Sequence, residues 1–290
     1  MTPERFSDFA RLVNAELELR VPPETVPPDP IHRAIRYSLF AGGKRLRPIL
    51  CLAACESLNA NPETLLPVAA AIEMVHTYSL VHDDLPCMDN DDFRRGKPTN
   101  HKVFGEAVAV LTGDALLTMA MEVLSSADYQ PSIRCRLINM LTKAAGTYGM
   151  IGGQVLDMVS ASVILTEQQL ENLHSMKTAA LIRFACVAAP VALESGTEIE
   201  EAFGEYGNFV GLAFQIVDDI LDIEGTTETL GKTAGKDRKH QKVTYPSLIE
   251  IEKSRKLAED FVDRACKIVS KHDPHHYLRT LAHRILEREK

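Results

Sequence analysis

Two clusters of acidic residues have the composition of a site for a metal ion and an anion. The first lies in the stretch HDDLPCMDNDDFRRG, which starts at His82. Five aspartates fall within ten residues there and two arginines follow at once: Asp83, Asp84, Asp89, Asp91, Asp92, Arg94 and Arg95. Clustered carboxylates favour a hard cation such as magnesium, which completes its shell with water and phosphate oxygens. Because guanidinium groups bind phosphate oxygens in pairs, the stretch predicts a site for a magnesium-bound diphosphate.

This stretch has two other interpretations. A solvated acidic turn is the simple alternative, since adjacent aspartates are common at exposed turns. A calcium loop of the EF-hand type is excluded by counting from Asp89. That register puts Phe93, Arg94 and Asn100 at the positions that need an oxygen ligand, a glycine and a glutamate.

The second acidic cluster lies in FVGLAFQIVDDILDIEG. Helical spacing places four polar residues on one face among apolar ones: Gln215, Asp218, Asp219 and Asp222. Burying these carboxylates without partners would be very costly, so the face is expected to bind a cation. A surface helix could show the same pattern by chance. Chance becomes a weaker explanation when two such clusters occur in one chain.

Two short basic segments could bind phosphate. In GGKRLRP, Lys44, Arg45 and Arg47 follow a glycine pair that could end a helix. In MKTAAL, Lys177 and Thr178 open an otherwise apolar helix. Taken alone, each run is typical of a solvated helix start.

A third basic segment, residues 224–242, is polar and includes Lys232, Lys236 and Lys242. A loop of this length in a compact domain is usually functional or disordered, so we expect a mobile lid. Its GTTETLGKT resembles a nucleotide-binding P-loop, but it has one residue too many between the glycines and follows a helix instead of a strand. Lys232 is better interpreted as a mobile phosphate ligand.

The elements that must position these residues are predicted to be helices. Nearly every extended segment has helical periodicity, and no run of strand-like hairpins is found. Several helices, such as TAALIRFACVAAPVAL, are apolar almost all round and should be surrounded by others. The expected helices cover residues 4–20, 31–41, 46–58, 65–85, 104–125, 131–159, 166–193, 198–223, 242–270 and 275–289. We therefore expect an all-α fold, one bundle of about ten helices, with residues 1–290 in a single domain.

The expected helix over 65–85 should present the first acidic cluster. Helical spacing puts His76, Ser79 and Asp83 on one face. Pro86 then bends or ends the helix. Three carboxylates can therefore converge at an accessible helix end: Asp83, Asp84 and Asp89.

The composition excludes several classes of protein. Of the 290 residues, 45% are hydrophobic and 25% charged, which is typical of a soluble globular chain. A formal charge of -8 argues against a dedicated nucleic-acid-binding protein. The six cysteines lack metal or redox spacing and are predicted to be reduced thiols. The longest apolar run, Phe184 to Leu193, is about half the length of a membrane span, so we expect no membrane span. The N-terminal segment has no signal-peptide pattern, so we expect a cytoplasmic protein.

Taken together, the motifs resemble those of the trans-isoprenyl diphosphate synthases, the polyprenyl synthetase family. DDLPCMD and DDILD are similar to the two aspartate-rich motifs of that family, and GGKRLRP, RRGKPT, GMIGGQVLD, KT and FQIVDD occur in the matching order. The resemblance spans about Arg33 to Ser247 and is greatest to bacterial farnesyl diphosphate synthases. It implies a helical bundle around a deep central cavity that acts as a homodimer on isopentenyl, dimethylallyl and geranyl diphosphate.

The resemblance also implies residue roles. Three magnesium ions would join the allylic diphosphate to Asp83, Asp84, Asp89, Asp218, Asp219 and Asp222. Cationic and polar side chains would contact that diphosphate: Arg94, Lys177, Thr178, Gln215, Lys232 and Lys242. The isopentenyl diphosphate would contact Gly43, Lys44, Arg47, His76 and Arg95. The groups expected to assist ionisation are Asp83, Asp84, Asp89, Arg94, Lys177, Asp218 and Lys232. The resulting allylic cation would be attacked by the double bond of isopentenyl diphosphate, followed by loss of a proton.

Product length is expected to depend on a bulky residue before the first motif. The resemblance assigns this role to Tyr78, whereas helix geometry alone favours Ser79 as the residue that lines the cavity. We expect farnesyl diphosphate, a C15 compound, with geranyl or geranylgeranyl diphosphate as the competing products. A class I terpene cyclase would not need two diphosphate sites, and a non-catalytic synthase subunit typically lacks one aspartate motif.

Overall fold

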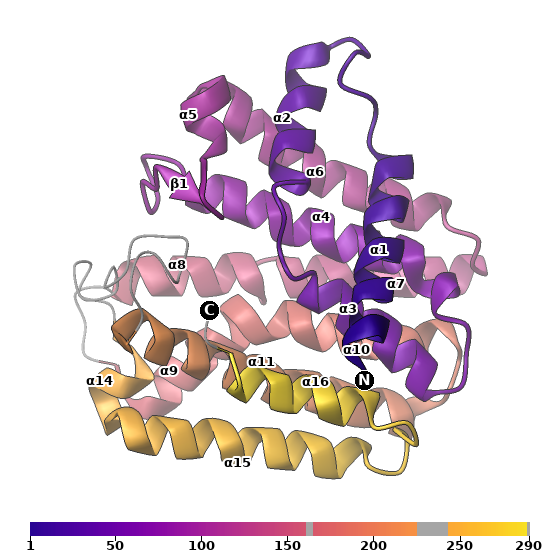
Figure 1. The fold of residues 1–290 in the computed structure, drawn as a ribbon, viewed down its shortest axis with the longest axis vertical. Coiled ribbons are helices and arrows are strands. Elements are labelled where there is room, and N and C mark those ends of the chain that lie inside the picture. Colours follow the sequence, from indigo (N-terminus) through magenta and orange to yellow (C-terminus); the bar gives the residue numbers. More distant parts are fainter. Residues whose placement is uncertain (161–164, 225–242, 289–290) are drawn as a thin grey trace. The chain divides into compact units, whose positions relative to one another are not determined.

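The computed structural model describes residues 1–160, 165–224 and 243–288 (Figure 1). The predicted all-α class is confirmed, because helices form almost all of the regular structure in these ranges. Residues 225–242 of the predicted lid, which include Lys232 and Lys242, lie outside the described residues. The chain divides into two compact units, which are described separately, and the single domain stays a prediction.

One unit consists of Thr2–Leu52 and Glu63–Ile138. Its central helix is α4 (Leu66–Asp83), which packs against α6 (Glu106–Ser126), α1 (Pro3–Arg20) and α2 (Asp29–Leu39). Because α4 is surrounded, it is apolar on nearly all sides and buries even Glu73. Gly113 of α6 allows close approach, since a Cβ there would lie 2.1 Å from the ring of His82. The short α5 (Asn100–Phe104) precedes α6, and α3 (Leu46–Ser57), the 3₁₀ turn Pro62–Leu65 and α7 (Pro131–Ala145) extend across the unit boundary.

A two-stranded hairpin follows α4 in the same unit. Strands β1 (Phe93–Arg94) and β2 (Lys97–Pro98) are antiparallel, with Arg94 opposite Lys97. The two turn residues, Arg95 and Gly96, both have positive φ, 53° and 74°, as a tight type I′ hairpin requires. This hairpin was not predicted, because its only local signal in the sequence is the glycine in FRRGKP.

The other unit consists of Met1, Ala53–Pro62 and Asn139–Lys290. Its longest helix, α11 (Thr197–Glu224), packs against α10 (Ala180–Ala192), α15 (Ile251–Val269) and α16 (Tyr277–Leu286). In Figure 1, α11, α15 and α16 run side by side. The unit also contains α8 (Met150–Ser160), α9 (Glu167–His174), a π-helical turn η2 (Ser175–Ala179) and α14 (Tyr245–Ile249). Gly211 lets α11 approach η2 so closely that a Cβ would lie 2.5 Å from Ala179.

Three predicted helices are interrupted. The segment 131–159 forms two helices, α7 and α8, because the chain turns between Gly146 and Gly149, where glycine weakens a helix interior. The segment 242–270 is also divided, since Glu250 adopts a left-handed φ of 71° between α14 and α15. The segment 166–193 contains the π turn η2 at Lys177. Such turns frequently occur at functional sites.

Within the part of the chain that the structure describes, three helical stretches are long and apolar enough to cross a membrane, judged by length and composition alone: Pro62–Asp83, Glu106–Ser126 and Glu167–Ala192. In the first and third, 67% of the most apolar window is buried within the protein, and in the second 39%. Packing against other helices accounts for much of their apolar character. The absence of a membrane span stays a prediction.

Candidate functional site

The first acidic cluster forms at the C-terminal end of α4, where the sequence places it. The chain turns back after Asp83, and the backbone N–H of Asp89 donates to the carbonyl of Asp83 at 2.8 Å. The N–H of Asp91 likewise donates to the carbonyl of Asp84 at 3.2 Å. These bonds bring Asp83, Asp84 and Asp89 together around one turn. Asp83 and Asp89 are half-buried, whereas Asp84 is buried.

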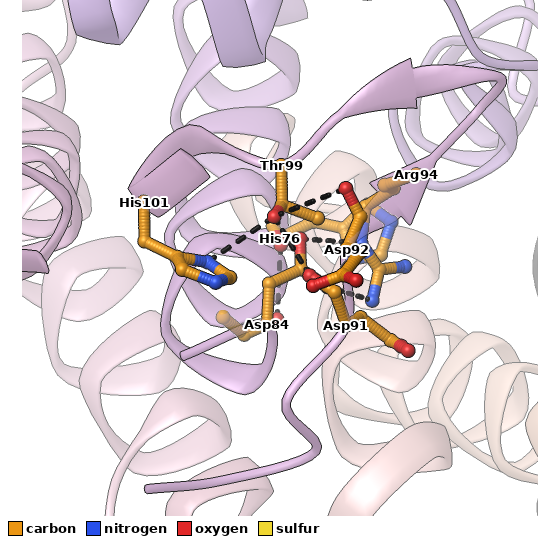
Figure 2. A network of polar contacts seen from close by, with 8 residues as sticks. His76, Asp84, Asp91, Asp92, Arg94, Thr99 and His101 are labelled. Atoms are coloured by element: carbon orange, nitrogen blue, oxygen red, sulfur yellow. Dashed lines mark hydrogen bonds and ion pairs between the residues drawn. The ribbon is translucent and has the colours of Figure 1, made fainter. Parts of the chain in front are cut away.

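Arg94 forms a forked ion pair with Asp84 (Figure 2). Its Nε and Nη2 donate to Oδ1 at 2.9 and 2.7 Å, and Nε also lies 2.9 Å from Oδ2. Burial raises the pKa of Asp84, and the hydrogen bonds and charge of Arg94 oppose that rise. Burial alone would lower the pKa of Arg94, but the hydrogen bonds that it donates to Asp84 raise that pKa. Each partner therefore holds the other charged and in one orientation.

Thr99 ties the hairpin back to the acidic turn, as Figure 2 shows. Its N–H donates to the carbonyl of Asp92 at 3.0 Å and its hydroxyl to the carbonyl of Asp91 at 2.7 Å. Because the hydroxyl proton is used on Asp91, Nδ1 of His101 must donate to Thr99, at 3.1 Å. The position of Arg94 thus depends on the residue after the hairpin as well as on its turn.

The hairpin turn places Arg95 against the glycine pair of GGKRLRP. Its Nη1 donates to the carbonyl of Gly42. Gly43 has a φ of 119°, and a Cβ there would lie 2.5 Å from the Arg95 guanidinium carbon. Glycine is needed at position 43 for both reasons. Two segments 53 residues apart are therefore brought together, as the predicted isopentenyl diphosphate site requires.

His76 lies among arginines and is kept neutral. Nη1 of Arg47 lies 3.4 Å from its Nε2, which must accept because a guanidinium can only donate. Burial and the charges of Arg47, Arg95, Arg94 and Arg45 lower the pKa of His76 well below its ordinary range. A concentration of positive charge around a neutral imidazole suits a polyanion such as a diphosphate. Lys44, also predicted for this site, is exposed on the same loop.

Arg45 plays a different part from its neighbours Lys44 and Arg47, a difference that the sequence pattern does not show. It is 5% exposed, and its Nη1 lies 2.5 Å from Oε1 of Glu73, which is 1% exposed. Its Nη2 donates to the carbonyl of Leu39 at 2.6 Å and its Nε to Asn14 at 3.0 Å. Its Nε, Nη1 and Nη2 therefore all bind residues of α1, α2 and α4, so Arg45 anchors the GGKRLRP loop to these helices.

The second acidic cluster is tied together by hydrogen bonds across three elements. The Thr178 hydroxyl of η2 donates to Oε1 of Gln215 at 2.6 Å, and Nε2 of Gln215 donates to Oδ1 of Asp219 at 2.9 Å. The N–H of Tyr245 donates to Oδ2 of Asp219 at 3.3 Å. Asp219 is 3% exposed, so both of its oxygens are used inside the protein. The predicted face therefore exists, but Asp219 points inward and organises it.

The other two aspartates of this cluster differ in exposure. Asp222 is buried, at 6%. Asp218 has a side chain that is 33% exposed, and its Oδ1 lies 3.3 Å from Nη2 of Arg288. No role was predicted for Arg288, because the sequence around it offers no signal.

Lys177 is held by the carboxylate of Asp157, for which no separate role was predicted from the sequence. Its Nζ lies 2.5 Å from Oδ2 of Asp157 on α8. Glycine makes this possible, because a Cβ at Gly153 would lie 2.3 Å from the backbone nitrogen of Lys177. The GGQVLD segment therefore lets α8 lie directly on η2, with Asp157 one turn beyond the contact.

His174, the last residue of α9, is expected to make the stability of the folded protein depend on pH. It is 6% exposed, and its Nδ1 has no hydrogen-bond partner among the described residues. Burial lowers the pKa of His174 to about 4. Between pH 6.5 and about 4 the unfolded chain therefore binds a proton that the folded protein does not, so we expect stability to fall by on the order of 3 kcal/mol over this range. Chemical denaturation of the protein and of His174→Phe at several pH values would measure this. Equal slopes in the two would contradict the assignment.

Tyr78 and Ser79, predicted to affect product length, lie on α4 before the first motif. Tyr78 is 5% exposed, and its ring stands edge-on to His82 with 5.8 Å between centroids. Burial and the nearby Asp83 raise the pKa of Tyr78 to about 12, and its hydroxyl has no hydrogen-bond partner among the described residues. Ser79 is half-buried and donates to the carbonyl of His76 at 2.9 Å. The role of each stays a prediction.

The donor chemistry fits magnesium. Among the described residues, no group of three or more His, Cys, Asp or Glu side chains converges as a complete metal site. Magnesium does not need such a group, since it usually takes one or two carboxylates and retains water or phosphate oxygens. Asp83, Asp89 and Asp218 supply partly exposed carboxylate oxygens of this kind. The number of ions stays a prediction.

Comparison with known proteins shows the family to which the chain belongs. A profile of the family described as Polyprenyl synthetase matches residues 28–277. The chain is 45% identical over 284 residues to a farnesyl diphosphate synthase of Micrococcus luteus, covering 98% of this chain and 97% of that protein. It is 51% identical over 257 residues to the heterodimeric geranylgeranyl pyrophosphate synthase large subunit 1, chloroplastic, of Arabidopsis thaliana, covering 86% of this chain and 69% of that protein.

Solved structures are similar over nearly the whole chain. The apo structure of an FPP/GFPP synthase from Zymomonas mobilis has a TM-score of 0.88 and 38% identity, covering 97% of this chain and 98% of that one. A geranyltransferase of Helicobacter pylori, complexed with magnesium and isoprenyl diphosphate, has a TM-score of 0.83 and 31% identity, covering 99% and 98%. Neither the family profile nor these neighbours favour a terpene cyclase or a non-catalytic subunit. The chain belongs to the polyprenyl synthetase family and is a prenyltransferase.

Proposed function

We propose that this protein is a magnesium-dependent farnesyl diphosphate synthase. It would condense isopentenyl diphosphate with dimethylallyl diphosphate and then with geranyl diphosphate. The observation that supports this most directly is that one segment after α4 supplies both the carboxylates of the first cluster and the paired arginines. The farnesyl diphosphate synthase of M. luteus, similar over nearly its full length, supports the C15 product. The geranylgeranyl pyrophosphate synthase match keeps the C20 product as the alternative.

The residues divide the work by charge. When bound, magnesium would neutralise the diphosphate oxygens and so favour departure of the allylic diphosphate. Arg94, held by Asp84, and Lys177, held by Asp157, would each bind leaving diphosphate oxygens as their charge grows. Arg47, Arg95 and neutral His76 would hold the second diphosphate, that of the attacking isopentenyl group. Departing diphosphate would then accept the proton that the condensed product loses.

A direct assay tests the proposal. The purified protein is incubated with isopentenyl and dimethylallyl diphosphate, with and without magnesium, and the product chain length is measured by mass spectrometry. A dominant C15 diphosphate that disappears with a metal chelator is expected. A dominant C20 product would show specificity for the longer product, with the condensation chemistry unchanged. No condensation in the presence of magnesium would refute the proposal.

The proposed basis of the C15 limit is the ring of Tyr78. Its size and burial suit a floor below the first carboxylate cluster, and removing the ring would open space for further C5 units. Tyr78→Ala is expected to shift the main product from C15 to C20 or longer, while Tyr78→Phe, which retains the ring, should leave it at C15. Product lengths from the same mass-spectrometric assay decide this. If Tyr78→Ala still stops at C15, the floor lies elsewhere and Ser79 becomes the next residue to enlarge.

We also propose that residues 1–290 act as one synthase domain and that two copies associate. Exposed apolar residues on α6, Val110 and Leu111 at 42% and 58%, are compatible with a second copy. Light scattering of the purified protein would measure the oligomeric state. A cytoplasmic location stays a prediction of the sequence.

A further inference from the structure

The side chain of Arg288 reaches the second acidic cluster from beyond the end of α16. Its Nη2 lies 3.3 Å from Oδ1 of Asp218, and its guanidinium lies 4.1 Å from the ring centre of Phe214, one turn earlier on α11. The side chain is 16% exposed, less than that of Asp218. A cation is therefore held on the more exposed carboxylate of the cluster, by stacking as well as by charge.

The guanidinium is not fully satisfied in this position. Its Nε and Nη1 are buried and have no hydrogen-bond partner among the described residues. A buried donor without a partner costs stability, so a side chain with only structural duties would be expected to have these groups paired. Arg45 shows the contrast, because its Nε, Nη1 and Nη2 all donate to protein oxygens.

Asp218 cannot give the same oxygen fully to Arg288 and to a metal ion. We propose that Arg288 is a built-in counter-ion that occupies Asp218 in the ligand-free enzyme and is displaced when magnesium and diphosphate bind. This rests on the proposed function, in which Asp218 is a metal ligand. Because two cations compete for one carboxylate, the contact with Arg288 must weaken metal binding by the free energy of that contact.

The competition has a measurable consequence. Calorimetric titration with inorganic diphosphate at a fixed, subsaturating magnesium concentration would compare the native protein with Arg288→Gln. The substitution is expected to tighten binding by about two- to fivefold, the range for a partly exposed ion pair. Arg288→Lys retains the charge but loses the forked guanidinium and its stacking, so its affinity for diphosphate should lie between those of the native protein and Arg288→Gln. Arg279→Gln is the matched control, because Arg279 is an exposed arginine on α16, and it should bind as the native protein does.

Displacement has its own readout. Amide hydrogen exchange of the native protein should become faster in Tyr277–Leu286 when magnesium and inorganic diphosphate are added, since the end of α16 loses its contact with α11. Unchanged or weaker diphosphate binding by Arg288→Gln, or unchanged amide hydrogen exchange in the native protein, would overturn the proposal that Arg288 is a displaced counter-ion. If neither the native protein nor any variant binds magnesium with diphosphate, the proposed function itself fails. Thermal unfolding of each variant, expected to match the native protein closely, confirms that the comparison is made on folded protein.

Discussion

Arg94→Met is expected to lower kcat for the condensation by about 10²–10³-fold, the usual loss when one charge-stabilising donor is removed from a reacting centre. The reason is twofold. In the proposed mechanism Arg94 binds the leaving diphosphate, and its forked bonds at 2.7 and 2.9 Å hold Asp84 in position. Steady-state kinetics with dimethylallyl and isopentenyl diphosphate would measure the loss.

Stability must be separated from catalysis in this experiment. Removing Arg94 leaves Asp84, 3% exposed, without its charge partner, which costs about 3–5 kcal/mol in buried pairs. The double variant Asp84→Asn/Arg94→Gln removes both charges and should recover much of the stability without recovering turnover. Arg94→Lys retains the charge without the fork and should be intermediate. If the double variant regains native kcat, the pair serves the fold alone and the catalytic role is refuted.

Glu73→Leu is expected to destabilise the protein by about 3–5 kcal/mol, because it strands Arg45 as an uncompensated buried charge. The two side chains are 1% and 5% exposed, and solvent cannot take over for either. Chemical denaturation followed by circular dichroism would measure the change. Replacing both, as Arg45→Met/Glu73→Leu, should restore most of the loss, since apolar side chains of similar volume often substitute for a buried ion pair.

An exposed pair in the same unit provides the control. Arg11 and Asp8 on α1 lie 3.2 Å apart but are 73% and 47% exposed, so Asp8→Asn should cost less than about 1 kcal/mol. The buried double variant tests function as well. With Arg45 gone, the Gly42–Gly43 loop loses its anchor, and KM for isopentenyl diphosphate should rise more than KM for the allylic substrate. A Glu73→Leu protein as stable as the native one would show that the buried pair has little net effect.

Part of the site could be predicted because it is local in the chain. Pro86 and the turn after it bring the N–H of Asp89 to the carbonyl of Asp83, and this acidic turn is formed by a few residues at the end of α4. The helical face with Gln215, Asp218 and Asp219 follows from the helix period in the same way. The helix breaks at residues 146–149 and at Glu250 were missed, since an apolar periodic pattern continues on both sides of each break.

What a carboxylate contacts is a different question from which face it occupies. Asp219 was predicted as a metal ligand alongside Asp218, and this stays a prediction. Its oxygens also accept from Gln215 and from the backbone of Tyr245, 26 residues away, which the helix period could not predict. The hairpin that directs Arg94 inward and Arg95 toward Gly42 also went unpredicted, since it is only two residues per strand.

The helical class and the two acidic faces, with the chemistry that they suit, follow from the sequence alone, because they depend on residue type and on spacing within one turn or one helix. The tertiary structure decided which charges are paired: Arg45 with Glu73, 28 residues apart, and Arg288 with Asp218, 70 residues apart. Such pairs form only where packing brings distant segments within about 3 Å of each other. Helix period contains no information about that distance, because it depends on how whole helices, with their glycine contacts and turns, pack together.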